Sequence, residues 1–369
     1  MSTQLSVLDL SPVPSGAGVG DALRNTLDLA RQVEAFGYHR YWLAEHHFAA
    51  GVASSATAVL IGAVAAATRH IRVGSGAVQV GHQTALAVAE AFGTLDALYP
   101  GRIDLGLGRS GQRRKEGAGP PPAATGARVV DGLLIPQLFS FSHLLASPRF
   151  AALGALLQQP GAESPDFAEQ VDDLFHLLRG TYVSADGYDA HAVPGEGADL
   201  QVWILGSSAG QSAQVAGAFG LPFAANYHVS PATVLEAVEG YRAAFKPGVL
   251  DAPYVSVSAD VVVAPTDAEA RELASPYGLW VRSIRGGGGA IPFPSPSEAA
   301  AHSWSDEDRA LVADRLDTQF VGSPDTVAAG LHTLRHATAA DELLITTITH
   351  DHAARVRSYE LLAKEWLQS

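Results

Sequence analysis

The sequence predicts an α/β protein built as a single (β/α)8 TIM barrel, and two observations carry this prediction. Short apolar strands alternate with helices at roughly 30 residues per unit, a spacing that is typical of a parallel sheet. Eight strand candidates are found, each followed by a helix, and no linker separates two apolar cores. A doubly wound open sheet would have to end at an arbitrary strand count. We therefore expect residues 1–369 to form one domain.

Each predicted strand is a short run of mainly apolar residues that is bounded by turn residues. The first run, LSVLDL, has the composition of a buried strand. The eight runs cover residues 5–10, 38–44, 71–78, 102–108, 200–206, 221–228, 254–264 and 341–349.

The predicted helices between these strands have apolar residues at helical spacing and recognisable ends. In the first helix, leucines and a valine follow this spacing until Gly37 ends it, and the second helix starts at a serine. The helices are expected at 20–37, 54–69, 85–101, 165–180, 208–220, 231–245, 323–337 and 352–367.

The regular alternation is interrupted twice, and we interpret both interruptions as insertions into the barrel. The first, at about 111–164 after strand four, begins with a loop-like GAGPPP run and continues as an apolar segment. The second, at about 282–303 after strand seven, contains four consecutive glycines followed by IPFPSP.

Composition excludes several classes of protein. No apolar run approaches the roughly 20 residues that span a bilayer, and the N-terminus does not resemble a secretory signal, so a cytoplasmic location is expected. The chain has no cysteine, which excludes disulfides and thiolate chemistry. A formal net charge of −14 without a basic cluster argues against nucleic-acid binding.

The run Glu45-His46-His47 follows the second predicted strand, and catalytic groups of such barrels lie where strands end. Metal binding is poorly supported, because adjacent histidines in an extended segment point in opposite directions and no further ligand cluster is visible. A structural role would leave one histidine packed and one solvated. A histidine that donates a hydrogen bond or moves a proton beside a bound ligand is the interpretation we favour.

Two further runs suggest a phosphate site. LGLGRS ends the fourth strand with Arg109, whose guanidinium suits phosphate, and LGSSAGQS joins the fifth strand to a helix that is expected to start at Ser207 and Ser208. Ordinary helix capping needs only one serine, so each run is weak evidence alone. Strands four and five are neighbours in a barrel, and the convergence of the two runs favours a phosphate-bearing ligand.

Small residues in RVGSGAVQVGH, at the end of the third strand, could leave a flat face for a planar ring. Packing against the neighbouring strands explains the same glycines equally well.

Together these segments resemble the bacterial-luciferase-like flavin monooxygenases, with GYHRYWLAEHHF and PGRIDLGLGR as the most specific matches. The resemblance implies a barrel that binds reduced FMN, reacts it with O2 and inserts one oxygen atom into an organic substrate. By position it assigns His46 to catalysis beside the flavin and Arg109, Ser207, Ser208 and Ser212 to the flavin phosphate. It also implies a non-proline cis peptide at Gly76–Ala77 beneath the flavin ring, and a substrate pocket that we assign to Glu45, Tyr227 and His228.

The resulting hypothesis is a two-component FMNH2-dependent monooxygenase acting on a bulky apolar metabolite. Epoxidation or hydroxylation of a polyketide in antibiotic biosynthesis is one such reaction. No strand–GxGxxG–helix unit is present, so a separate NAD(P)H-dependent flavin reductase would supply the cofactor. Gly108 stands where luciferases have a reactive cysteine, which argues against light emission.

The rival hypotheses are a deazaflavin-dependent hydride-transfer enzyme and a non-catalytic flavin-binding protein. In helix 54–69, small residues cover more than the one face that packs on a barrel, which suggests a second packing partner. Members of the resembled family also tend to pair through this region, so a homodimer is expected.

Overall fold

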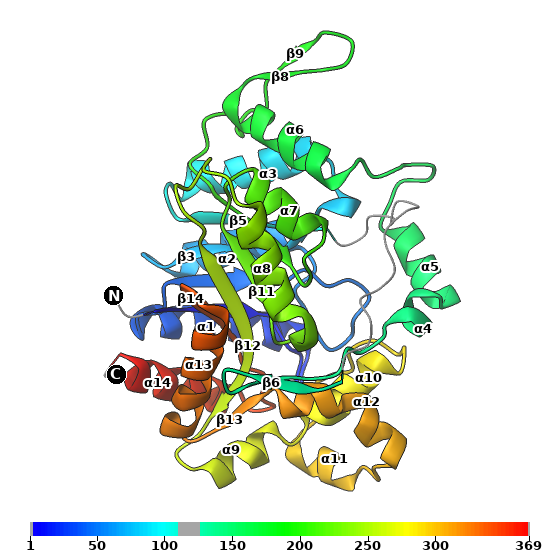
Figure 1. Cartoon of the computed structure of the whole chain (residues 1–369), viewed down its shortest axis with the longest axis vertical. Coiled ribbons are helices and arrows are strands. Elements are labelled where there is room, and N and C mark those ends of the chain that lie inside the picture. Colours follow the sequence, from blue (N-terminus) through cyan, green and yellow to red (C-terminus); the bar gives the residue numbers. More distant parts are fainter. Residues whose placement is uncertain (1–2, 110–125, 368–369) are drawn as a thin grey trace.

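Eight parallel strands close into a barrel in the computed structural model, which describes residues 3–109 and 126–367 (Figure 1). Each strand pairs in parallel with the next, and the β5–β10 and β14–β1 pairings complete the circle. The predicted (β/α)8 barrel is therefore confirmed. In order around the barrel, the strands are β1 (Gln4–Asp9), β2 (Arg40–Leu43), β3 (Arg72–Ser75), β5 (Ile103–Gly108), β10 (Gln201–Gly206), β11 (Phe223–Asn226), β12 (Val255–Val263) and β14 (Glu342–Thr346).

The helices that follow these strands cover the outside of the barrel. Three start three residues later than the sequence predicts: the second helix at Thr57, the helix after β10 at Gln211 instead of Ser208, and the helix after β11 at Val234. At two of these starts a serine makes another bond: Ser54 Oγ donates to the carbonyl of Leu10, and Ser208 Oγ accepts from Gly210 N–H. The eight helices are α1 (Val19–Ala35), α2 (Thr57–Ala67), α3 (Ala85–Leu98), α6 (Phe167–Arg179), α7 (Gln211–Ala218), α8 (Val234–Ala244), α13 (Pro324–Thr338) and α14 (His352–Trp366).

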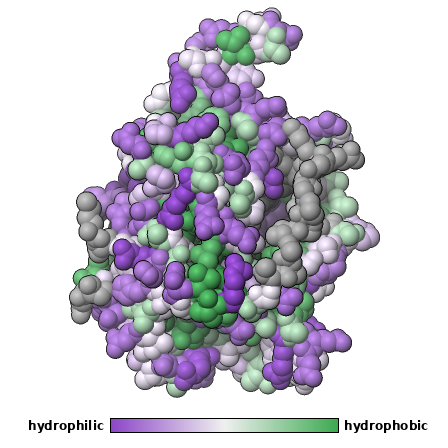
Figure 2. All heavy atoms as spheres, viewed as in Figure 1, coloured by the Kyte–Doolittle hydropathy of each residue, from purple (hydrophilic) through white to green (hydrophobic). Residues whose placement is uncertain are grey.

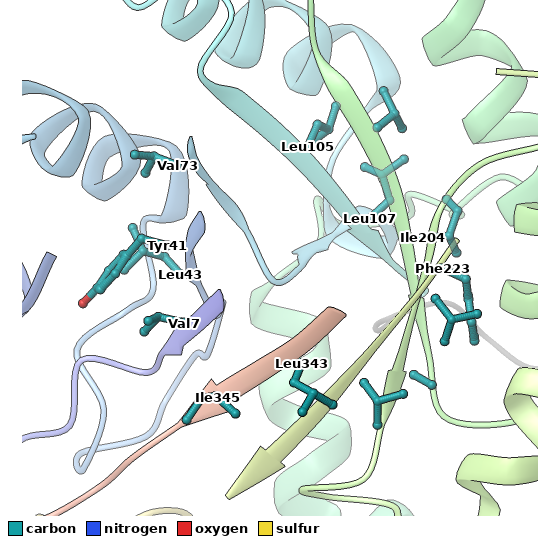
Figure 3. Packing of buried hydrophobic residues seen from close by; sticks show 14 of the residues in the cluster. Val7, Tyr41, Leu43, Val73, Leu105, Leu107, Ile204, Phe223, Leu343 and Ile345 are labelled. Atoms are coloured by element: carbon teal, nitrogen blue, oxygen red, sulfur yellow. The ribbon is translucent and has the colours of Figure 1, made fainter. Parts of the chain in front are cut away.

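Side chains alternate between the two faces of each strand, and this alternation decides which residues reach the site. Figure 3 shows residues of the outer face, which pack beneath the helices; those labelled are Val7, Tyr41, Leu43, Val73, Leu105, Leu107, Ile204, Phe223, Leu343 and Ile345. The inner face forms a separate buried cluster that includes Leu8, Trp42, Trp203 and Leu344, and the two indole rings meet edge to face at 5.0 Å.

A buried charge network, hereafter the plug, fills the barrel at the N-terminal ends of the strands. Arg40 donates from Nε to Glu342 Oε1 at 2.9 Å and from Nη1 to Asp104 Oδ2 at 2.8 Å. Asp104 also accepts from Arg72 Nε at 2.7 Å and from Trp42 Nε1 at 2.9 Å. Because the plug closes this end, a ligand can enter the barrel only from the opposite end, hereafter the mouth.

The insertion after β12 is larger than the predicted 282–303, and that boundary is wrong. Four helices and a strand separate β12 from α13, and α10 and α12 are held together by the buried Arg285, which donates to Asp314 Oδ2 at 2.8 Å. Phe293 is buried, and its N–H donates to the carbonyl of Val13 at 2.7 Å, so the insertion forms a wall of the mouth beside β1. Its elements are α9 (Asp267–Ala274), α10 (Tyr277–Arg285), α11 (Pro296–Ala301), α12 (Asp306–Asp317) and β13 (Phe320–Gly322).

The described part of the insertion after β5 lies against this wall (Figure 1). The guanidinium of Arg285 lies 3.9 Å from the ring centroid of Phe139, and Arg149 Nη1 donates to the carbonyl of Gly287 at 2.8 Å. Its elements are β6 (Arg128–Val130), β7 (Leu133–Ile135), α4 (Ser142–Leu145) and α5 (Pro148–Leu156). Short elements elsewhere are β4 (Val78–Gln79), η1 (Val80–His82), β8 (Tyr182–Val183), β9 (Asp189–Ala190) and η2 (Pro231–Thr233).

The two ends of the described chain meet at the plug end of the barrel. β1 pairs with β14 from Gln4↔Glu342 onward, and Trp366 Nε1 donates to the carbonyl of Thr3 at 2.8 Å. Figure 1 shows the N and C labels on the same side of the molecule. Figure 2 shows polar residues over most of this view, with apolar residues gathered in a strip near its centre. Within the described residues, no helix has the length and apolar character required to cross a membrane.

Candidate functional site

His46 continues the inward-facing series of β2, after Trp42 and Ala44, and so projects into the mouth. Its backbone N–H donates to the carbonyl of Ser54 at 2.8 Å, which fixes the loop. No hydrogen bond to its ring is found within residues 3–109 and 126–367, and the side chain is exposed at the mouth. Desolvation by the neighbouring protein, together with the charge of His47, lowers the pKa of His46 to about 4. At neutral pH the imidazole is therefore uncharged and free to bind a ligand.

Glu45 is buried and makes its side-chain bonds to His47 and to the backbone of Gln79, and its place in the substrate pocket stays a prediction. As a neighbour of His46 it points the other way, where its Oε1 lies 2.9 Å from His47 Nε2 and its Oε2 accepts from Gln79 N–H at 3.2 Å. Gln79 Nε2 donates in turn to the carbonyl of Glu45 at 2.7 Å. Glu45 therefore joins the end of β2 to β4 and positions the loop that carries His46.

The peptide bond between Gly76 and Ala77 is cis, at the position that the resemblance implies. It lies between β3 and β4, beside the glycines of β5. Packing accounts for some of these glycines, because a Cβ at Gly74 would lie 2.4 Å from the carbonyl oxygen of Asp104. A Cβ at Gly76 would lie 2.7 Å from Leu8 Cδ1, and one at Gly108 would lie 3.2 Å from Ala77 Cβ. Gly76, Ala77 and Gly108 are all partly exposed, and the alanine methyl is their one side chain. We refer to these three residues as the platform.

Arg109 and the serines after β10 converge as the sequence predicts. Gly108 pairs with Leu205, which places Arg109 beside the start of the β10–α7 loop. Arg109 is exposed, and its Nη1 donates to Oε1 of Gln211, the first residue of α7, at 3.3 Å.

The first turn of α7 supplies the remaining donors of this region. Ser207 and Ser208 precede the helix and are exposed, while Ser212 is buried within its first turn. The first amides of a helix have no intrahelical partners, and Gly210 at the N-cap offers no side chain to satisfy them. These amides, the hydroxyls and Arg109 form an anion cradle, hereafter the cradle.

Tyr227 and His228 follow β11 and point to opposite sides of the barrel wall. Tyr227 is buried in the outer cluster, where its hydroxyl donates to the carbonyl of Leu134 at 2.8 Å. The place of Tyr227 in a substrate pocket with His228 stays a prediction. His228 continues the inward series of Ala224 and Asn226, and its Nδ1 lies 2.6 Å from Ser258 Oγ.

Four functional candidates were not predicted from the sequence. Ser258 and Asp260 face inward on β12, Tyr277 donates to Asp260, and Arg315 Nη2 lies 3.2 Å from Asp260 Oδ2. Burial raises the pKa of Asp260 even though Arg315 opposes this. The alternating polar residues of VSVSAD could have indicated Ser258 and Asp260. No sequence pattern marked Tyr277 and Arg315, which lie in the second insertion.

Stability should fall in mild acid partly because of His228. Burial, the charge of Arg315 and that of His46 lower the pKa of His228 from 6.5 to about 3, so the unfolded chain binds a proton below pH 6.5 that the native protein excludes. The free energy of unfolding therefore decreases as the pH falls through this window. Between pH 7 and pH 5, wild type should lose about 1–2 kcal/mol more than His228→Gln in urea titrations. Equal losses would contradict the assignment.

Within the described ranges, no group of three His, Cys, Asp or Glu side chains is arranged to hold a metal ion. The site instead combines the cradle, the platform and an uncharged histidine at the C-terminal ends of barrel strands. This arrangement defines a (β/α)8 barrel suited to a planar cofactor with a phosphate.

Comparison with known families is consistent with this class. The family model described as "Luciferase-like monooxygenase" matches residues 3–137 and 146–342, and the chain belongs to this family. The chain is an enzyme of the flavin monooxygenase type that defines the family.

Relatives are similar over nearly their whole length. "Uncharacterized protein YvbT" of Bacillus subtilis is 40% identical over 99% of this chain and 97% of its own. A "Luciferase-like monooxygenase" of Escherichia coli strain K12 is 36% identical over 96% of this chain and 95% of its own. The crystal structure of apo-MsnO8 is 32% identical, covers 100% of this chain and 98% of its own, and has a TM-score of 0.79.

Proposed function

We propose that the protein is the oxygenase of a two-component system that uses FMNH2 and O2 to insert one oxygen atom into a bulky apolar metabolite. The finer form of this proposal is epoxidation or hydroxylation of a polyketide. The observation that supports it most is the uncharged His46 ring, which shares the mouth with the cradle and the platform.

The residues at the mouth fit FMN. Arg109 and the first turn of α7 would hold the phosphate, since both offer donors and positive potential at one point. The partly exposed Gly76, Ala77 and Gly108 would support a flat ring, because the alanine methyl is their one side chain. When bound there, the reduced flavin supplies the reaction with O2.

His46 would hold a proton at its ring. As a neutral imidazole it has one donor and one acceptor nitrogen, so it can pass a proton to or from a reacting oxygen at neutral pH. Glu45 would keep the ring in place through its bonds to Gln79 and His47.

An apolar wall lies on the side of the mouth away from the cradle. Buried side chains from β1, from the segment after β14 and from the second insertion pack together there, among them Leu10, Phe293, Trp280 and Ile348. Such a wall suits an apolar substrate and helps to exclude water from the reaction.

A separate enzyme that reduces the flavin is part of this proposal. The run GLGRSG at 106–111 has the glycine spacing of a dinucleotide-binding loop, but the segment after it is rich in Gly and Pro and does not resemble a helix. A flavin reductase using NAD(P)H would therefore deliver FMNH2.

Mixing the protein with photoreduced FMN and then with air tests the function. An oxygenase should give an O2-dependent absorbance transient that free FMNH2 does not give, and should delay hydrogen peroxide release. A deazaflavin enzyme would prefer reduced F420 and transfer hydride without O2. A protein that binds FMNH2 without changing its oxidation rate would rule out the oxygenase.

Arg109→Ala should weaken FMN binding by about 1.5–3 kcal/mol, the scale of hydrogen bonds to charged groups. Riboflavin, which has no phosphate, should bind both proteins equally. Titrations followed by flavin fluorescence measure both affinities. An equal loss for FMN and riboflavin would show that Arg109 does not contact phosphate.

We further propose a homodimer in which α2 meets its symmetry mate. Val59 is 75% exposed and shares its helix face with exposed Ala63 and Ala66, while Leu98 on neighbouring α3 is 64% exposed. These residues present an apolar surface that a monomer would leave in water.

Val59→Asp should convert the dimer to a monomer, as measured by light scattering at micromolar concentration. Val249→Asp, at an exposed loop valine outside this surface, should leave the dimer intact. A monomeric wild type would refute the proposal.

A further inference from the structure

His46 and His228 face each other across the mouth. Around the closed barrel, three strands separate β2 from β11 in each direction: β3, β5 and β10 on one side, and β1, β14 and β12 on the other. Both residues continue the inward series of their strands. The charge of His46 also contributes to lowering the pKa of His228. The cradle and the platform occupy the first side and the apolar wall the second. His228 therefore lies at the boundary between the proposed flavin half and the substrate half.

Two bonds hold the backbone around His228. Asn226 Oδ1 accepts from Val229 N–H at 2.8 Å and from Ser230 N–H at 3.3 Å, which closes the turn after β11. The side chain of His228 is then fixed by Ser258 through the 2.6 Å contact at Nδ1.

The hydrogen bonds of Ser258 determine the tautomer of His228. Ser258 Oγ donates to the carbonyl of Ala225 at 3.4 Å, and a hydroxyl has only one hydrogen. A hydroxyl hydrogen directed at Ala225 leaves the Ser258 oxygen to accept from the imidazole, which favours Nδ1 as the donor. In a neutral imidazole the other nitrogen has no hydrogen, and Nε2 presents a lone pair.

Burial keeps the His228 ring neutral, and the surrounding charges act in the same direction. Arg315 and His46 are the charged or titratable groups that act on His228, and Arg315 is itself bound to Asp260 and Tyr277. A second proton on His228 would be repelled by Arg315, so Nε2 does not become a donor at physiological pH.

We propose that His228 Nε2 is a fixed hydrogen-bond acceptor that selects a ligand bearing an O–H or N–H donor at this boundary. The proposal deepens the function proposed above and rests on it for the occupant of the mouth. Two sources share this chemistry, namely the flavin, through its ring N–H or ribityl hydroxyls, and a hydroxyl or amide on the organic substrate. In either case, a ligand that presents only an acceptor at this point would be disfavoured.

The tautomer can be measured in the protein without flavin or substrate. Protein labelled with 15N-histidine is observed by long-range 1H–15N correlation at pH 7, and His228→Gln identifies the signals of His228. We expect a protonated Nδ1 and an unprotonated Nε2. Ser258→Ala should release the ring into a mixture of tautomers, whereas Ser256→Ala, at a buried inward serine of the same strand, should leave it unchanged.

A protonated Nε2 in the wild type would overturn the proposal. The proposal would also be overturned if the tautomer of His228 in Ser258→Ala were the same as in the wild type. Because this measurement needs no flavin, its failure is distinguishable from failure of the FMNH2 assay.

FMN binding to His228→Phe distinguishes the two sources. A loss of about 5–10-fold, the size of one neutral hydrogen bond, would identify the flavin as the donor. A change of less than about twofold, with the fixed tautomer present, would assign the donor to the substrate. A loss of the same size in Ser256→Ala would show a general disturbance of the barrel and overturn a specific role for His228.

Discussion

Asp104→Asn should reduce the free energy of unfolding by about 3–5 kcal/mol, the usual cost of removing one partner from a buried ion pair. Asp104 is completely buried and accepts hydrogen bonds from Arg40, Arg72 and Trp42. Burial opposes the charge of Arg40, but Glu342 and Asp104 outweigh it and raise the pKa of Arg40 above its ordinary value. An amide at position 104 would leave this guanidinium with Glu342 as its only buried counter-charge.

Urea titration at pH 7 measures this effect, and Asp21→Asn is the matched control. Asp21 also pairs with an arginine, Arg24, but both side chains are more than half exposed, so the substitution should leave stability nearly unchanged. If the two variants lost similar stability, the plug would not be a principal source of barrel stability.

His46→Ala should lower oxygenation by about 10²-fold or more, the usual size of an acid–base contribution. Its melting temperature should stay within a few degrees of wild type, because the His46 side chain is exposed at the mouth. Product formed per FMNH2 oxidised, together with the hydrogen peroxide released, would separate lost chemistry from lost flavin binding.

His47→Ala is the control for this prediction. The two histidines are adjacent, but His47 bonds Glu45 on the other side of the segment, so its loss should cost less than tenfold through weaker positioning. Equal losses in the two variants would show that His46 has no special part in the reaction.

The barrel and the convergence of its ligand-binding ends were predictable, because strand pairing obeys local rules. Parallel strands joined by helices pair in chain order, so Arg109 and Ser207 had to meet once their strands were recognised. His46 was assigned to the mouth by the same reasoning and lies there.

For two residues, position along the chain was used without the alternation of side chains. Glu45 and Tyr227 each adjoin a residue of the mouth, and their side chains bond to His47 and to the carbonyl of Leu134. A count from the buried inward residue Trp42 places Glu45 on the opposite face of the segment.

Other contacts had no local signal. Arg315 reaches Asp260 from 55 residues further along the chain, and this pairing depends on how the second insertion folds over β12. Long-range contacts of this kind require the three-dimensional packing of the insertion, which one sequence does not supply.

The contact between Thr3 and Trp366 has a practical consequence for engineering. Because Thr3 and Trp366 lie together at the plug end, a short peptide that joins this part of the chain would not cross the mouth. New termini opened at the β8–β9 hairpin, whose turn residue Gly187 is exposed, would interrupt no pairing between barrel strands. Such a circular permutant should retain flavin binding, and its new ends would provide a fusion point for the reductase on the outside of the barrel.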